Sequence, residues 1–314
     1  MTSAEAARRA VSHLLGADAV TARSLPGGDI GAVFVVDLVD GARVVAKLPV
    51  RPGSEAPGEA PEVHRDRAGR AVAAEDAGLR WIADAVPGLA PGVVAAGEGW
   101  LVLDFVPPGA PSAAAAEELG RGLAALHAAG APAFGAAPPG GPGRAVVGAL
   151  DMTNEPTPDW PTFYREQRVE PYLRRAVDLG RLDASQRAVL RRVQERLPDL
   201  AGPTEPPARL HGDLWSGNLL WTERRRGPGA VLLDPAAHGG HRETDLAMLR
   251  LFGAPHLDRL VDAYAEVRPL APGWRDRVGL HQVFPLLVHA VLFGGGYGAR
   301  AAEAGRSALG GSRH

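Results

Sequence analysis

Short apolar runs dominate the first hundred residues of the chain and predict extended strands. The runs are bounded by Gly, Pro and Asp, which favour turns between strands. They cover residues 20–25, 33–38, 43–48, 93–94 and 100–105. Between the second and third runs, Asp40-Gly41 is a hairpin signal. The pattern predicts an antiparallel five-stranded sheet in the N-terminal third of the chain.

A helical pattern, in which apolar residues recur every three or four positions, interrupts the strands once and dominates the later part of the chain. The helix within the strand region covers about residues 65–85. Further helices are predicted at about residues 112–129, 162–179 and 184–197, and the second of these is expected to bend near Pro171. The Pro/Gly-rich stretches 49–62 and 131–148 are expected to be irregular loops.

A Pro-rich connector at residues 106–111 separates the strand-rich part from the helical part. Such connectors commonly mark the boundary between two compact units. We therefore expect an α+β fold with two lobes. Residues 1–105 would form a small N-terminal lobe of sheet plus helix, and residues 106–314 a larger, mainly helical C-terminal lobe.

Short extended runs return near residue 210, where they surround polar residues. They cover 208–210, 218–221 and 230–233, and the last two flank a turn rich in Gly and Arg. These two runs are therefore expected to pair as a hairpin. Pairing would bring Asp234, at the end of the final run, next to Asn218, which lies sixteen residues earlier.

Composition and charge exclude several classes of protein. The chain has 314 residues, a net charge of −2 and no apolar run of membrane-spanning length. Neither nucleic acid nor a membrane is therefore an expected partner. No cysteine is present, which excludes disulfides and thiolate chemistry. The N-terminus lacks a signal-peptide core, so we expect a cytoplasmic protein; the sequence does not predict an oligomeric state.

One residue type is almost missing. Of the 34 Lys and Arg residues, only Lys47 is a lysine. A genome rich in G and C explains the excess of Arg, Ala, Gly and Pro, but the same bias would also replace Lys47 unless arginine fails there. A compact ammonium differs from a planar guanidinium at phosphates and in tight pockets. Lys47 is therefore a candidate functional residue.

The stretch His211-Gly212-Asp213 to Asn218, together with Asp234, carries the residue types that phosphoryl transfer requires. That reaction needs oxygen ligands for Mg²⁺, a cation on the phosphates and a carboxylate that orients the acceptor hydroxyl. The Asp-x-x-x-x-Asn spacing is that of a kinase catalytic loop. Asp213 is the candidate base, while Asn218 and Asp234 are candidate Mg²⁺ ligands; His211 is expected to support the loop.

Upstream residues complete a candidate ATP site. Lys47 on a strand followed by Glu75 on a helix is the order in which kinases pair these residues. The turn containing Gly27 and Gly28 precedes the second strand, and such glycines allow backbone N–H groups to approach phosphates. From chain order alone, the strand end and connector at Asp104, Phe105 and Val106 are expected to meet the adenine.

A second polar cluster at residues 238–245 suggests a zinc site, because it holds two His and two carboxylates. The spacing of His238, His241, Glu243 and Asp245 matches no standard zinc pattern, so zinc is not expected. Asp245 is expected instead to cap the following helix and to tie the loop together.

With these residues, the sequence resembles the fructosamine (ketosamine) kinase family, a relative of the aminoglycoside phosphotransferases and choline kinases. The resemblance spans nearly the whole chain. Its specific motifs are HGDLWSGN at 211–218, Asp-Pro-Ala at 234–236, and Glu243-x-Asp245-Leu-Ala-Met. It implies a protein-kinase-like fold and phosphorylation, dependent on ATP and Mg²⁺, of a ketosamine at the 3-hydroxyl of the sugar.

The resemblance also implies the acceptor side of the site. Trp215 would be a platform for the sugar, and His289 is a second candidate substrate-binding residue. The acceptor would be a small ribulosamine or fructosamine adduct, or a glycated lysine on a peptide or protein, in deglycation repair or metabolite recycling. Asp29 in the glycine-rich turn departs from expectation, since its charge repels phosphate.

Three other interpretations remain open. One is a kinase of another hydroxylated amine, such as an aminoglycoside or a choline-like compound, which Trp215 and Asp234-Pro-Ala disfavour. A metallophosphoesterase would need histidine directly after Asn218, where this chain has Leu219. A nucleotide-binding pseudokinase is disfavoured by the presence of Lys47 and Asp213.

Overall fold

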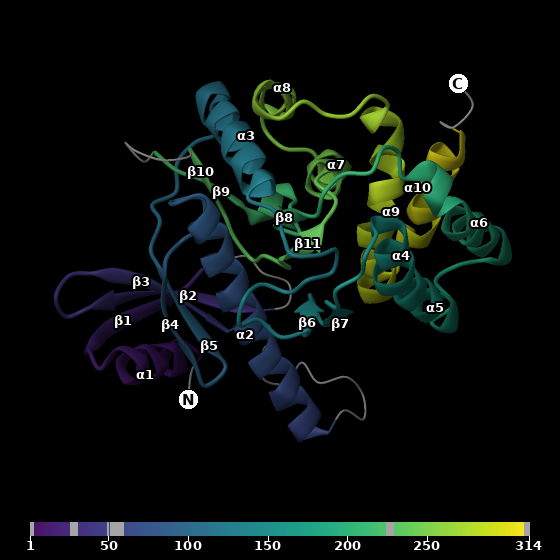
Figure 1. Ribbon diagram of the computed structural model, residues 1–314. Helices are drawn as coiled ribbons and strands as arrows, with labels where there is room; N and C mark the ends of the chain where they lie inside the picture. The colour runs from purple at the N-terminus through teal and green to yellow at the C-terminus, as the bar shows by residue number, and fades with distance from the viewer. Residues whose placement is uncertain (1–2, 26–30, 49, 51–59, 224–228, 311–314) are drawn as a thin grey trace.

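The computed structural model describes residues 3–25, 31–48, 50, 60–223 and 229–310. Figure 1 shows a sheet with helices α1 and α2 at one end of the molecule, and a larger group of helices at the other. Helix α2 lies between the sheet and a short hairpin that belongs to the later part of the chain. Within the described residues, no helix is both long and apolar enough to cross a membrane.

The predicted five-stranded sheet is confirmed. Its strand order is β1-β2-β3-β5-β4, with every neighbouring pair antiparallel. Its strands are β1 (Ala19–Ser24), β2 (Ala32–Leu38), β3 (Arg43–Leu48), β4 (Val93–Gly97) and β5 (Trp100–Asp104). Lys47 lies on the central strand β3, opposite Val33 on one side and Leu101 on the other.

The two helices of this part cover opposite faces of the sheet, because side chains of a strand alternate between the faces. Helix α1 (Ser3–Leu15) packs with one core that includes Phe34, Val36, Ala46 and Val102. Helix α2 (Pro61–Ala85) shares the other core with Leu101 and Leu103. It begins four residues before the predicted start, with Pro61 at a position where a missing N–H costs nothing.

The described part of the chain after residue 105 is mainly helical, as predicted. Its α-helices are α3 (Ala113–Ala128), α4 (Trp160–Phe163), α5 (Glu170–Asp178), α6 (Ala184–Leu200), α7 (Glu243–Phe252), α8 (Leu257–Val267), α9 (Trp274–Phe293) and α10 (Tyr297–Gly310). Strand β8 (Ala208–Leu210) pairs with β11 (His238–Gly240). The expected hairpin is confirmed: β9 (Leu219–Trp221) pairs antiparallel with β10 (Ala230–Leu232).

The expectation of an irregular loop over residues 131–148 is wrong at its C-terminal end. Strand β6 (Arg144–Val147) pairs with β7 (Leu150–Thr153) in a hairpin that lies against α2. From α2, Arg70 Nη1 donates to Asp151 Oδ1 at 2.8 Å and to the Arg144 carbonyl at 3.2 Å. The strands are too short to produce a periodic pattern amid the surrounding Gly and Pro residues, which explains the missed prediction.

The helix expected over residues 162–179 is irregular just before Pro171, where a bend was predicted, but it is divided rather than bent. A π-helical segment, η1 (Tyr164–Val169), joins α4 to α5, and Pro171 in the first turn of α5 lacks the N–H that a regular helix needs. The segment carries Arg168, which is fully buried and donates to the Thr153 carbonyl at 2.7 Å and to Asn154 Oδ1 at 2.6 Å. Arg168 thereby holds the C-terminal end of β7 in place.

Helices α3 and α8 approach each other closely at Gly120. A Cβ atom added to Gly120 would lie 2.1 Å from the Leu260 carbonyl oxygen and 3.1 Å from the Tyr264 nitrogen. Gly69 in α2 is the opposite case, since nothing lies within 4 Å of a Cβ added there. Packing therefore requires glycine at position 120. At position 69 glycine has no packing role and is a poorer helix former than alanine.

We predict that Gly120→Ala lowers the free energy of unfolding by about 1–3 kcal/mol, because α8 must move away. The matched substitution Gly69→Ala should raise it by about 0.5–1 kcal/mol, since alanine is the better helix former. Urea unfolding of both variants measures the difference. Equal effects of the two substitutions would contradict the close approach of α3 and α8.

Candidate active site

A cavity of about 830 Å³ lies where the sheet, α2 and the β6–β7 hairpin meet the loops around β9 and β10. Five of the residues singled out from the sequence for chemistry or metal binding line it: Lys47, Glu75, Asp213, Asn218 and Asp234. Trp215 and His289 line it as well. Residues separated by more than 240 positions therefore share one cavity. A phosphoryl-transfer site built from these residues requires this arrangement.

Lys47 forms a compact ion triad with two carboxylates. Its Nζ donates to both oxygens of Glu75 at 2.8 Å and to Asp234 Oδ1 at 2.5 Å. Lys47 is only 8% exposed. Burial alone would lower the pKa of Lys47, but the charges of Glu75 and Asp234 outweigh it and raise that pKa. The ammonium is therefore held in its charged form.

Glu75 depends on this triad because it is buried within α2. Burial raises the pKa of Glu75, and the charge of Asp234 adds to this effect, whereas Lys47 opposes it. A buried carboxylate is stable in its charged form only when a cation lies beside it. The triad thus links α2 and β3 to the residue that follows β10.

The loop around Asp213 is closed by Asn218. The Asn218 side-chain nitrogen donates to the Asp213 carbonyl at 2.8 Å and to Asp213 Oδ2 at 3.2 Å. The Leu233 N–H donates to the Asn218 carbonyl at 2.9 Å, which places Asp234 directly beside Asn218. The predicted return of Asp234 to Asn218 across the hairpin is therefore confirmed.

Two backbone positions make this loop unusually tight. Asp234 has a φ of 55°, a left-handed conformation that Asp tolerates better than most residues. Gly212 has a φ of 84°, and a Cβ there would lie 2.1 Å from the Ala236 carbonyl oxygen. The segment after β10 thus packs directly against the loop that carries Asp213, and only glycine fits between them.

Asp213 is in an environment that disfavours its negative charge. Partial burial in the cavity raises the pKa of Asp213 to about 7, and the nearby charge of Asp234 contributes to this shift. The hydrogen bond from Asn218 acts in the opposite direction. A carboxyl group with a pKa near neutrality can both accept and release a proton under ordinary conditions.

The oxygen atoms at this site fit a hard divalent cation. The Asn218 side-chain nitrogen is occupied by Asp213, which leaves the amide oxygen as the available ligand atom. The Asp234 side chain is about half exposed to the cavity. One amide oxygen and one carboxylate, with room for water and phosphate oxygens, is the ligand set that Mg²⁺ prefers.

A buried hydrogen-bond network supports the catalytic loop from behind. Asp245 accepts the His211 N–H at 2.8 Å and the Gly212 N–H at 2.9 Å, and it pairs with His127 at 3.1 Å. The His127 Nδ1 in turn lies 2.9 Å from the Tyr264 hydroxyl. Each of the two carboxylate oxygens of Asp245 therefore holds one backbone N–H of the loop.

The expectation that Asp245 caps the following helix is wrong. Helix α7 begins at Glu243, its N-cap is Arg242 without a side-chain capping bond, and Asp245 lies inside the first turn. The side chain of Asp245 is committed to the catalytic loop instead. The expectation that Asp245 ties the loop together is confirmed by its bonds to His211 and Gly212.

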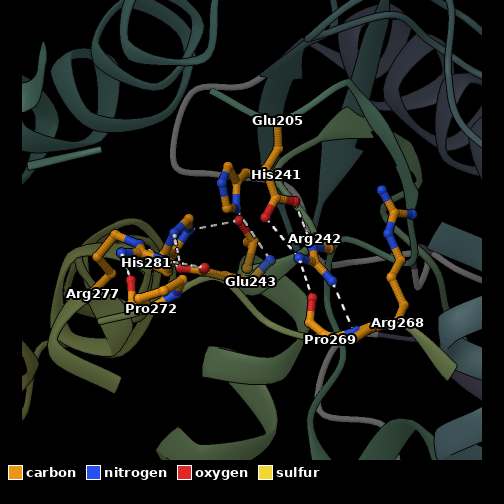
Figure 2. Close-up of polar contacts among 10 residues, drawn as sticks. Glu205, His241, Arg242, Glu243, Arg268, Pro269, Pro272, Arg277 and His281 are labelled. Atoms are coloured by element: carbon orange, nitrogen blue, oxygen red, sulfur yellow. Dashed lines mark hydrogen bonds and ion pairs between the residues drawn. The ribbon is translucent and has the colours of Figure 1, made fainter. Parts of the chain in front are cut away.

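The polar residues after β11 form a second cluster with His281 of α9 (Figure 2). Potential ligand atoms of His241, Glu243 and His281 lie within 4.8 Å of one another. Both oxygens of Glu243, however, accept hydrogen bonds from Arg277, at 2.9 and 2.6 Å. The Nδ1 of His241 accepts the Glu243 N–H at 3.2 Å.

These bonds favour an ion-pair network over a metal site. A guanidinium on both carboxylate oxygens supplies the compensating positive charge that a cation would otherwise bring. Burial lowers the pKa of His241 to about 3, so His241 is neutral here. Arg242 forms a separate pair with Glu205, with a bond of 2.7 Å, and the two pairs anchor the start of α7 (Figure 2).

One part of the cavity is lined by aromatic residues. The Trp215 and Phe252 rings meet edge to face, with centroids 5.9 Å apart. The centroid of the His289 ring lies 5.2 Å from that of Phe252 and 5.1 Å from that of Tyr297. Phe293 also lines the cavity. The aromatic contacts of Phe252, Phe293 and Tyr297 were not predicted. The four-residue interval between His289 and Phe293 in α9 is a signal for one shared helix face, whereas Tyr297 belongs to α10 and gives no such signal.

Two groups of predicted nucleotide-binding residues do not reach this cavity or cannot be placed. Gly27 and Gly28 lie outside the described residues. Asp104, Phe105 and Val106 follow β5, and none of them is among the described residues that line the cavity. Arg43 stacks on the Phe105 ring at 5.0 Å, and Val106 is buried. Their contact with adenine remains a prediction.

Comparison with known proteins agrees with this geometry. A candidate ketoamine kinase of Lactiplantibacillus plantarum is 35% identical over 229 residues, which cover 71% of this chain and 77% of that protein. A chloroplastic protein-ribulosamine 3-kinase of Arabidopsis thaliana is 32% identical over 206 residues, which cover 66% of this chain and 60% of that protein.

A solved structure supports the same relationship. The fold is similar to that of a candidate fructosamine-3-kinase from Thermobifida fusca, with a TM-score of 0.84. The two sequences are 42% identical, and the match covers 96% of this chain and 98% of the other. The two-lobed, kinase-like α+β fold is therefore confirmed.

A family model described as fructosamine kinase matches residues 62–309, which is most of the chain. The match includes Glu75, the loop from His211 to Asn218, and Asp234. Kinases transfer a phosphoryl group, and ATP is the donor that this kind of enzyme implies. The chain belongs to the fructosamine kinase family.

Proposed function

We propose that the protein phosphorylates the 3-hydroxyl of the sugar in ketosamines, such as ribulosamine or fructosamine adducts, with ATP as donor. One observation carries the proposal. Asp213 and the Lys47 triad share a cavity whose other end is formed by aromatic rings. A phosphoryl-transfer site therefore opens directly onto a surface suited to a sugar, since aromatic faces pack against sugar C–H groups.

Asp213 is proposed as the catalytic residue that orients the acceptor hydroxyl and accepts its proton. Its Oδ2 is held by Asn218, and its pKa near 7 suits proton transfer at neutral pH. His211 is a positioning residue, because its Nδ1 accepts the Asp213 N–H at 3.2 Å and its Nε2 lies 2.8 Å from the Leu233 carbonyl. The ring thereby connects the Asp213 loop to the chain just before Asp234.

The donor side is proposed to hold ATP and Mg²⁺. Lys47, kept in place by Glu75, would contact phosphate oxygens, and the turn with Gly27 and Gly28 would cover them. The Asn218 amide oxygen and the Asp234 carboxylate would hold Mg²⁺, which neutralises charge on the phosphates when bound. The connector residues Asp104, Phe105 and Val106 are proposed to contact adenine.

We also propose a division into lobes, with residues 1–105 contributing the donor side and 106–314 the catalytic loop and acceptor side.

On the acceptor side, Trp215 is proposed as the sugar platform and His289 as a second contact. Both small ketosamines and glycated lysines on proteins carry this sugar. Phosphorylation next to the ketone carbonyl creates a leaving group that destabilises the adduct, which suits repair of glycated amines.

The proposed activity is tested by measuring ATP consumption with Mg²⁺ and ribuloselysine, fructoselysine or an aminoglycoside as acceptor. We expect turnover with a ketosamine and loss of at least about 100-fold in kcat for Asp213→Asn, because the hydroxyl loses its base. Circular dichroism of the variant checks that the fold is intact. Undiminished turnover in Asp213→Asn excludes Asp213 as the base, and turnover of the aminoglycoside alone excludes the ketosamine.

Lys47→Arg tests whether the lone lysine is required. The Lys47 ammonium contacts three carboxylate oxygens within 2.8 Å, a geometry that a planar guanidinium cannot reproduce. We expect a loss of at least about tenfold in kcat/KM for ATP. The control is Arg80→Lys, an exposed residue of the same helix as Glu75 that pairs with Asp76. Full activity of Lys47→Arg would show that the single lysine is an accident of composition.

The raised pKa of Asp213 predicts how activity depends on pH. A base must be unprotonated, so kcat/KM for the acceptor should rise as pH increases towards about 7 and level off above it. An initial-rate pH profile from pH 5 to about 9 measures this limb. A flat profile through neutrality would contradict the assignment.

The same shift has a stability signature that does not depend on activity. Because the folded-state pKa of Asp213 lies above its unfolded value of about 3.9, Asp213 destabilises the fold increasingly as pH rises towards about 7. Asp213→Asn should therefore raise Tm at pH 8 but have little effect near pH 4. Asp151→Asn is the opposite control: salt bridges lower the pKa of Asp151, so this substitution should lower Tm at pH 8.

A further inference from the structure

The exposed aromatic residues of this protein gather at one place. Among the described residues, Trp215 and Phe293 are the two aromatic side chains that are large, apolar and exposed, at 39% and 48%. Both line the active-site cavity. An exposed aromatic surface costs free energy in water and is retained where it contacts a ligand. The acceptor end is therefore built to bind more than the reacting hydroxyl.

The cavity also changes in charge from one end to the other. Glu75, Asp213 and Asp234 supply the carboxylates at the end where phosphoryl transfer is proposed. The other end is formed by Phe252, Phe293 and Tyr297, and His289 is neutral there because burial lowers its pKa. Charged groups at one end, Lys47 among them, and aromatic rings at the other define a direction along which an acceptor can lie.

Arg300 stands at the aromatic end and belongs to helix α10, one turn after Tyr297. Its guanidinium carbon lies 5.8 Å from the centroid of Phe252 and 5.3 Å from that of Tyr297. Arg300 is exposed, and in the part of the chain that the structure describes no carboxylate pairs with it within 4.0 Å. Two rings that line the cavity thus position the guanidinium of an exposed side chain.

The order of groups in a ketosamine of an amino acid matches this arrangement. Its reacting hydroxyl is followed by a secondary ammonium, and the ammonium by the carboxylate of the amino acid. The Phe252 and Tyr297 rings line the cavity that also contains Asp213, and the Arg300 guanidinium lies against both rings. Aromatic faces attract ammonium groups, and a guanidinium binds a carboxylate through charge-assisted hydrogen bonds.

We propose that Arg300 is a specificity-determining residue that selects ketosamines of free amino acids, in which a carboxylate lies close to the glycated nitrogen. The proposal rests on the proposed function and specifies its acceptor class. A glycated lysine side chain in a protein offers no carboxylate at this distance from the sugar. Arg300 also disfavours acceptors whose amine part carries additional positive charge, because like charges repel.

The test compares two acceptors that differ in one charge: the ribulose adduct of alanine and that of alaninamide. For the native protein we expect kcat/KM to be about tenfold higher with the carboxylate, mainly through KM. In Arg300→Gln the ratio should fall to about one. The matched control is Arg306→Gln, an exposed arginine of the same helix that pairs with Glu303, and its ratio should equal that of the native protein.

Raising the salt concentration provides a second readout. The preference for the carboxylate should decrease with salt in the native protein, since exposed charges are screened. Equal use of both acceptors by the native protein overturns the proposal, as does a ratio in Arg300→Gln that stays at the native value. Failure to phosphorylate either ribulose adduct, with the fold intact, instead overturns the proposed function itself.

Discussion

The contact of the Lys47 ammonium with Glu75 and Asp234 is the interaction on which the rest of the site depends. It joins β3, α2 and the segment after β10, which are far apart in the sequence. A charged side chain of this contact would destabilise the fold if it were buried without its partners. Together they fix the relative positions of the sheet and the catalytic loop. The β6–β7 hairpin adds a second connection through Arg70 and Asp151.

The catalytic loop is supported from behind by groups that never reach the cavity. Asp245 holds two backbone N–H groups, His127 holds Asp245, and Gly120 allows α8 to approach the helix that carries His127. Asp245 lies in α7, while His127 and Gly120 both lie in α3. A substitution in this layer is expected to act on the geometry of Asp213 and only through it on chemistry. Tight packing transmits such small displacements because protein interiors have little free space.

Much of the site could be predicted from the sequence because its residues lie in recognisable local patterns. The Asp213 to Asn218 spacing, the hairpin that returns Asp234, and the lone Lys47 are each visible without a structure. The aromatic end of the cavity was missed because Phe252 of α7 and Tyr297 of α10 contact His289 of α9 only after these helices have packed. The β6–β7 hairpin was missed because four-residue strands leave no periodicity. Pro171 indicated a bend, but the π-helical form of the segment before it has no simple sequence signal. Long-range packing decides these features.

The near absence of lysine has a consequence for the protein's own exposure to sugars. Lysine ammonium groups must lose a proton before they attack a sugar carbonyl, and arginine side chains form no ketosamine. The only lysine of this chain is almost completely buried and is held protonated by two carboxylates. The side chains of this protein are therefore poor sites for ketosamine formation. Its single lysine cannot attack a sugar carbonyl while Glu75 and Asp234 keep it protonated and buried.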